Sequence, residues 1–120
     1  MDLTVQMREF SSVALLPDDL RAKQSVYEKV HQGRDAHGTS NEERNEKELQ
    51  WNTELIYGEI IYQYFVPVLE YADIKDGEVF WDLGCGGGKP VFTAAMAYPG
   101  LKAAKGIELL EKLAGLASEI

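Results

Sequence analysis

Residues 79–88 read Val-Phe-Trp-Asp-Leu-Gly-Cys-Gly-Gly-Gly, and this stretch decides the fold class. Its first five residues are aromatic or branched apart from one acid, which is typical of a short β-strand. Four glycines within residues 84–88 predict a tight turn, because glycine adopts a positive φ at little steric cost. Lys89 and Pro90 then open a run of small residues to Ala97, and proline suits the first turn of a helix. The pattern predicts a strand, a glycine loop and a helix.

The chain after this unit repeats the alternation of strand and helix. Pro99 and Gly100 indicate a turn, residues 103–108 a second short strand, and residues 109–120 the start of another helix. Two strands joined by a helix usually pair in parallel. The predicted fold class is therefore α/β, and residues 51–120 are expected to open a parallel α/β sheet.

Two acidic residues flank the glycine loop and indicate its ligand. Asp82 lies two residues before Gly84, and Glu108 ends the second predicted strand. In nucleotide-binding βαβ units an acid at about 20 residues after the loop reaches the ribose hydroxyls. Asp82 would repel a pyrophosphate but attract an amino group, such as that of a methionine moiety.

Other nucleotides fit the glycine loop less well. The dinucleotide fingerprint needs a small residue where this chain has Lys89, and no Gly-Lys-Ser/Thr sequence follows the loop. The pattern therefore favours S-adenosylmethionine over NAD or ATP. The alternative is an α/β domain whose glycine turn binds nothing.

Residues 1–50 are predicted to be a helical N-terminal region. Pro17, followed by two aspartates, indicates a helix start, and Gly33 indicates its end near Gln32. Residues 33–41 are polar and contain glycine, which is typical of a loop.

A second, charged helix is predicted to begin at a cap on Asn41 and to extend to about Gln50. Its acids and bases alternate, so we expect a solvated face. Residues 51–59 have no clear period and predict a structured loop. Residues 60–72 carry apolar side chains at helical spacing, with a kink or a break between two short helices expected at Pro67.

Residues 79–88 resemble motif I of the seven-strand (class I) S-adenosylmethionine-dependent methyltransferases. Residues 53–59, Thr-Glu-Leu-Ile-Tyr-Gly-Glu, resemble the Tyr-Gly-Glu loop of the disruptor-of-telomeric-silencing histone lysine methyltransferases, which are non-SET enzymes. Residues 106–108, Gly-Ile-Glu, match a further segment of that family. The resemblance covers residues 53–110 and implies the opening half of a Rossmann-like sheet behind a helical N-terminal region.

Carried over by position, the resemblance implies roles for individual residues. Tyr57 and Glu59 would be catalytic residues in a loop that folds over the methionine end of the cofactor and helps to wall the lysine channel. Glu108 would hold the ribose. The full set implied to bind S-adenosylmethionine is Tyr57, Gly58, Glu59, Asp82, Gly84, Cys85, Gly86, Gly88, Lys89 and Glu108, with no metal.

The chain departs from the family pattern at several positions. Ile60 stands where a small hydroxyl residue is frequent, Lys89 stands where an amide is common, and Cys85 and Gly87 replace serine and valine. The family's Asn-Asn-Phe segment should follow well after Glu108, beyond the last residue of this sequence. We therefore expect an N-terminal portion of a methyltransferase domain that by itself binds the cofactor weakly or not at all.

The activity implied by the resemblance is methyl transfer to a lysine on the globular face of histone three, in nucleosomes and hence in the nucleus. A neutral lysine amine would attack the sulfonium methyl in line and displace the cofactor's sulfur as the leaving group, so the protein mainly aligns and desolvates the reactants. Two alternatives stay open. The first is a class I methyltransferase of a small molecule, RNA or another protein in the cytoplasm, and the second is a truncated, non-catalytic cofactor-binding module.

Composition limits the classes of partner. The 120 residues carry 12 Lys and Arg against 20 Asp and Glu, a net charge of −8, which excludes a globally basic nucleic-acid binder. Any DNA contact is expected to come from outside this chain. The longest mostly apolar stretch, residues 60–69, is about half the ~20 residues of a membrane span, so we expect no membrane partner.

Several other side chains are expected to have structural roles. Cys85 is interpreted as a small residue that fits the turn rather than as a nucleophile, since it has no visible histidine partner. His31 and His37 lack a partner at metal-ligand spacing and are expected at the surface. The aromatic residues expected in the core are Trp51, Tyr62, Tyr64, Phe65 and Trp81.

Overall fold

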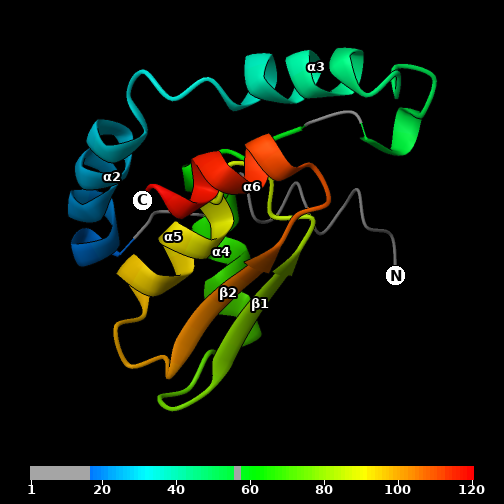
Figure 1. Cartoon of the computed structure of the whole chain (residues 1–120). Coiled ribbons are helices and arrows are strands. Elements are labelled where there is room, and N and C mark those ends of the chain that lie inside the picture. The colour runs from blue at the N-terminus through cyan, green and yellow to red at the C-terminus, as the bar shows by residue number, and fades with distance from the viewer. Residues whose placement is uncertain (1–16, 56–57) are drawn as a thin grey trace, which may run out of the picture.

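The computed structural model describes residues 17–55 and 58–120. Over these residues the chain forms helices around one small sheet (Figure 1). In chain order the elements are α2 (Asp18–His31), α3 (Ala36–Glu46), the short 3₁₀ helix η1 (Thr53–Leu55), α4 (Tyr62–Ala72), β1 (Val79–Leu83), α5 (Lys89–Ala97), β2 (Ala103–Ile107) and α6 (Glu111–Ser118). No helix of this described part is both long and apolar enough to cross a membrane.

The sheet is the predicted parallel pair. β1 and β2 pair in parallel, from Val79 opposite Ala103 to Leu83 opposite Ile107. Helix α5 connects the two strands and packs against both of them, while α2 and α4 pack on α5 (Figure 1). The α/β class and the order of strand, glycine loop, helix and strand are confirmed.

Within the described residues the core has two parts, and each includes one of the N-terminal helices. One cluster joins Leu20 of α2 with Tyr62 and Val66 of α4 and Ala97 of α5. Within it the Tyr62 hydroxyl donates to the Leu20 carbonyl oxygen, at 2.7 Å between the oxygens. The second cluster consists of Ala36, Leu110 and Leu113 and lies where α3 packs on α6 (Figure 1).

Helix α2 has nearly the predicted bounds, but its last residue, His31, is buried and not exposed as predicted. It begins after Pro17 and ends at His31, and Gly33 has a φ of 74°. The expectation that His31 lies at the surface is wrong, because only 7% of this residue is exposed. Its ring contacts Tyr27, with centroids 4.7 Å apart, and Phe92 of α5, with centroids 5.1 Å apart. The packing of α2 on α5 buries it.

Helix α3 begins earlier than predicted, so the loop assigned to residues 33–41 is wrong beyond Asp35. Asp35, and not Asn41, is the N-cap, and its Oδ1 accepts from the Gly38 N–H at 2.9 Å. The predicted solvated face is present, with Asn41, Glu42, Asn45 and Glu46 exposed, but the helix also has a buried face that was not predicted. Glu43 is 1% exposed and Arg44 is 8% exposed, because α3 packs against α6.

Helix α4 is continuous through Pro67, so the predicted break is wrong. The proline lies in the second turn and removes only one backbone donor, a loss that packing of the buried face offsets. Tyr62, Val66 and Leu69 form that buried face.

The aromatic residues divide between core and surface. Tyr62 is buried as expected, whereas Trp51, Tyr64 and Trp81 are 75%, 45% and 51% exposed, and their assignment to the core is wrong. In β1 the outward face of the sheet carries Trp81, and the Lys105 ammonium lies 5.2 Å from its ring centroid. This cation–π contact gives the exposed indole a partner on β2.

Candidate cofactor site

The glycine loop is held at the carboxyl ends of both strands. The N–H groups of Gly84 and Cys85 both donate to the carbonyl oxygen of Ile107, at 2.8 and 2.9 Å. Gly84, Gly86 and Gly88 have φ values of 84°, 55° and 86°, which favour glycine at these three positions. In open α/β sheets ligands bind at this edge, outside the carboxyl ends of the strands.

Glu108 fastens the end of β2 to the glycine loop. Its Oε2 accepts from the Gly86 N–H at 2.8 Å, and its Oε1 accepts from the Leu110 N–H at 3.0 Å. Both oxygens are thereby oriented, although each carboxylate oxygen retains a further lone pair for a ligand hydroxyl.

The structure brings the two predicted acids of the loop to one edge of the sheet. Burial, and after it the negative charge of Glu108, raises the pKa of Asp82. Like charges that are partly withdrawn from water destabilise each other. A cationic group bound between the strand end and the loop would therefore relieve an existing electrostatic cost.

Glu59 of the Tyr-Gly-Glu segment forms an ion pair with Lys89, directly after the glycine loop. Lys89, the first residue of α5, lies 2.6 Å from Glu59, measured from Nζ to Oε2, and both side chains are about one-fifth exposed. Gly58 is exposed beside it. Tyr57 lies outside the described residues.

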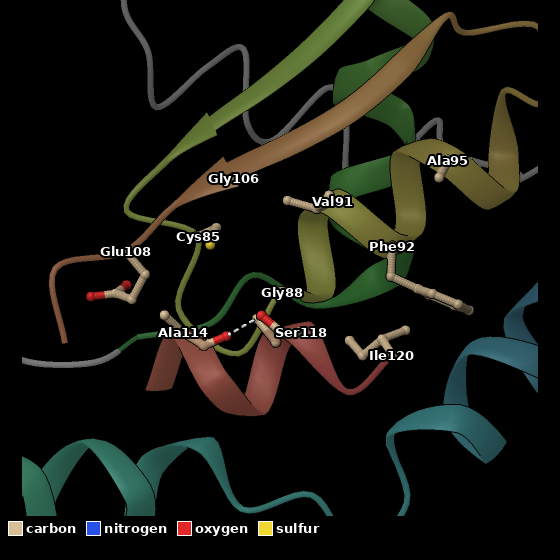
Figure 2. Close-up of a pocket in the computed structure, with 11 residues that line it drawn as sticks. Cys85, Gly88, Val91, Phe92, Ala95, Gly106, Glu108, Ala114, Ser118 and Ile120 are labelled. Atoms are coloured by element: carbon tan, nitrogen blue, oxygen red, sulfur yellow. Dashed lines mark hydrogen bonds between the residues drawn. The ribbon is translucent and has the colours of Figure 1, made fainter. Parts of the chain in front are cut away.

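Described residues form two cavities that adjoin the loop, and Cys85 lines both of them. The smaller has a volume of about 200 Å³ and is lined by Gly58, Glu59, Ile60, Asp82, Gly84, Cys85, Lys89 and Pro90. The larger has a volume of about 360 Å³ and lies between α5, the end of β2 and α6, with Glu108 at the β2 end (Figure 2). Asp82 and Glu108 thus line neighbouring cavities that share one loop residue.

Cys85 packs against β2 and has no feature of a nucleophile. It is buried, and a Cβ added to Gly106 would lie 2.6 Å from its Sγ. Burial, followed by the charges of Asp82 and Glu108, raises the pKa of the thiol and keeps it protonated. Reactive cysteines need the opposite, a lowered pKa.

The lining of the smaller cavity fits the amino-acid end of S-adenosylmethionine. Asp82 and Glu59 are acceptors for an ammonium group, and Lys89 is a donor for a carboxylate. The positive φ at Gly84 lets the backbone approach a ligand where no Cβ intervenes. Among the residues that the structure describes, no three His, Cys, Asp or Glu side chains form a group suited to a metal ion.

Three residues near the site were not anticipated from the sequence. His31 is buried beside Lys89, and neither of its ring nitrogens has a hydrogen-bond partner within the described part of the chain. Burial, then the charges of Lys89 and Arg34, lowers the pKa of His31 to about 4. Glu43 and Arg34 contact the two ends of α6. No local sequence signal marks these contacts, since their partners lie far along the chain.

Comparisons with known proteins bear on the same segments. Residues 39–120 match the family described as "Histone methylation protein DOT1". The "Histone-lysine N-methyltransferase, H3 lysine-79 specific" of Eremothecium gossypii is 32% identical over 71 residues. These residues are 59% of this chain and 12% of that protein, so the chain spans about an eighth of the length of the curated relative it matches. No solved structure matches the chain.

Proposed function

This chain belongs to the DOT1 family of histone methylation proteins, and we propose on that premise that it supplies the cofactor-binding part of an S-adenosylmethionine-dependent histone lysine methyltransferase. The proposed target is lysine 79 of histone three in nucleosomes, after the name of the matched relative, and the proposed location is the nucleus. The contact between Glu59 and Lys89 carries the proposal, because it joins the Tyr-Gly-Glu segment to the glycine loop.

The proposed fold is the opening half of a Rossmann-like class I methyltransferase sheet. The parallel pair of β1 and β2, with the glycine loop at their carboxyl ends, supports it. We keep the division into a helical region, residues 1–50, and a cofactor-binding part, residues 51–120, as a prediction.

The proposed binding mode assigns each end of the cofactor to described side chains. Asp82 and Glu59 would accept hydrogen bonds from the ammonium group, and Lys89 would donate to the carboxylate. Glu108 would accept from the ribose hydroxyls with the lone pairs that its backbone donors leave free. When bound, the cofactor supplies an electrophilic methyl group on a sulfonium.

The contribution of the protein to the reaction is alignment and desolvation. Fixing two reactants in line can recover about 7–11 kcal/mol of the barrier. A substrate lysine must also arrive without its proton, and an apolar channel lowers its pKa. Tyr57 and Glu59 stay predicted as residues of that channel. The net charge of −8 favours nucleosomal DNA contacts outside these 120 residues.

The cofactor part of the proposal is tested by titrating isotope-labelled chain with S-adenosylhomocysteine and recording amide NMR spectra. We expect weak binding, with the largest shifts at Gly84, Gly86 and Gly88. Asp82→Asn and Glu108→Gln should each weaken binding about tenfold, whereas the exposed Glu78→Gln, matched in charge change, should not. A wild-type spectrum unchanged at millimolar ligand would contradict the cofactor assignment.

The substrate part is tested by methyl transfer. A protein that carries this chain is incubated with radiolabelled S-adenosylmethionine and either nucleosomes, free histone three or small acceptors. We expect incorporation only with nucleosomes, and mass spectrometry should place it on lysine 79 of histone three. Incorporation into small acceptors alone would establish a different class I methyltransferase.

A further inference from the structure

Helix α6, which follows Glu108 directly, is held at both ends by charged side chains from the N-terminal region. At its start, Glu43 Oε1 accepts from the N–H groups of Lys112, at 2.8 Å, and Leu113, at 3.3 Å. At its end, the Arg34 guanidinium donates to the carbonyl oxygen of Leu116. Each charge has the sign that stabilises its end of the helix dipole.

The carboxylate of Glu43 is buried for this contact and is ionised there. The residue is 1% exposed, and Lys47 lies 2.8 Å away from Nζ to Oε2. Burial alone would raise the pKa of Glu43, but the Lys47 ammonium and the backbone N–H groups of Leu113 and Lys112 outweigh it and lower the pKa. A buried carboxylate that has lost its donors would be costly, so the contact is maintained in the folded state.

The contacts continue without interruption from α6 to the glycine loop. Leu110, the N-cap of α6, is 2% exposed, and its N–H donates to Glu108 Oε1. Glu108 Oε2 in turn accepts from the Gly86 N–H. Glu43 therefore fixes the start of the helix whose cap residue orients the Glu108 carboxylate.

We propose that Glu43 is a positioning residue for Glu108: by fixing the first turn of α6, it holds the Glu108 carboxylate against the glycine loop. This role rests on the proposed function, in which Glu108 binds the ribose. It assigns the charged helix α3 a part in cofactor binding although α3 does not line either cavity beside the loop.

The rival explanation is that apolar packing alone places α6, since Ala36 and Leu113 belong to one buried cluster. A matched control separates the two. Glu46 lies one turn further along α3 and also pairs with Lys112, but through the exposed ammonium, 2.6 Å from its Oε2, and not through the backbone. Glu46→Ala thus removes an acid from the same helix and leaves the backbone contacts of α6 intact.

The experiment measures amide hydrogen exchange by NMR in the ligand-free chain for the wild type, Glu43→Ala, Glu43→Gln and Glu46→Ala. In Glu43→Ala we expect about tenfold faster exchange at Lys112 and Leu113, and also at Leu110 and Gly86, whose N–H groups bind Glu108. Amides in the middle of α5, such as Ala94, should be unchanged. Glu43→Gln, which keeps an acceptor oxygen, should restore part of the protection and serves if Glu43→Ala does not fold.

Two results would overturn the proposal. One is faster exchange at Lys112 and Leu113 with unchanged exchange at Gly86, which would make Glu43 a local cap only. The other is an equal increase at every amide, including Ala94, which would make its effect one of global stability.

Titration of the same variants with S-adenosylhomocysteine links the positioning to binding. We expect Glu43→Gln to bind severalfold more weakly than Glu46→Ala, and equal affinities would contradict the proposal. If the wild type does not bind the ligand at all, the proposed function fails, and the exchange pattern still decides whether Glu43 positions Glu108.

Discussion

The glycine loop and helix α3 both fix the surroundings of Glu108, but they do so by different means. The loop uses backbone N–H groups, of Gly84 and Cys85 toward Ile107 and of Gly86 toward Glu108 itself. Helix α3 uses a charged side chain, Glu43, whose partners lie 69 and 70 positions away. The backbone contacts of the loop depend on glycines that can be recognised in the sequence. The contact of Glu43 joins residues far apart in the sequence, and no local pattern indicates it.

The strongest test on the backbone side is Gly106→Ala. The added methyl group would lie 2.6 Å from both Cβ and Sγ of Cys85 and 3.0 Å from Val91 Cγ2. We expect the free energy of unfolding to fall by about 3 kcal/mol, measured by urea denaturation.

The companion variant removes the opposing side chain. Cys85→Gly in the background of Gly106→Ala should recover part of the lost stability, and the coupling measured in this double-mutant cycle locates the clash. Additive effects of the two changes would show that the loop does not pack on β2 as the structure has it.

The contact of His31 in α2 with α5 is tested by measuring the free energy of unfolding as the pH is lowered. The pKa of His31 is lowered to about 4 from an ordinary 6.5, so between these pH values the unfolded chain binds a proton that the folded chain does not. Stability from this group is therefore complete above pH 6.5 and is lost as the pH falls toward 4. We expect a loss of about 3 kcal/mol at pH 4.

Comparison of the wild type with a variant that lacks His31 separates this effect from the titration of the acidic residues. In His31→Phe the aromatic contacts with Tyr27 and Phe92 are retained and the titrating group is removed. The difference in free energy of unfolding between wild type and variant should change with pH only below about 6.5. If the difference in free energy of unfolding is constant from pH 7.5 to 4.5, the pKa of His31 is the same in the folded and the unfolded chain, and burial does not lower it.

The beginning of α3 is tested by the choice of cap. Asp35→Ala removes the acceptor of the Gly38 N–H and should lower the free energy of unfolding by about 1 kcal/mol. Asn41→Ala, at the cap expected from the sequence, lies within the helix and should cost nothing. Thermal denaturation monitored by circular dichroism compares the two variants. A larger loss of stability in Asn41→Ala than in Asp35→Ala would show that α3 begins at Asn41, as the sequence predicted.

The smallest effect is expected at Gly115 of α6. It has helical neighbours, and an added Cβ would have no heavy atom within 4 Å. Gly115→Ala should raise the free energy of unfolding by about 0.5–1 kcal/mol, the opposite sign to Gly106→Ala. Destabilisation in the same denaturation assay would show that α6 packs more tightly there.

Most of the sheet unit could be predicted from the sequence because its signals are local. The aromatic and branched residues of β1, the glycines at positive φ and Pro90 at the start of α5 each act within a few residues. The start of α3 could not, since Asp35 and Asn41 are both competent caps and tertiary packing decides between them.

The acids and glycines of the candidate site could be predicted from the sequence. The buried residues that pack around the site could not. Asp82 and Glu108 stand next to recognisable elements, so their common edge follows from the parallel topology. The burial of His31 and of Glu43 depends on which helix lies opposite, information that no short window contains.

The exposed indole of Trp81 has a practical consequence. It directly precedes Asp82 in β1, lies half in solvent and is next to the Lys105 ammonium. Its fluorescence emission should respond to events at the neighbouring carboxylate, and Trp51→Phe would remove the background of the other tryptophan. The molecule thus carries its own optical reporter beside the loop, and ligand screening could proceed without an attached dye.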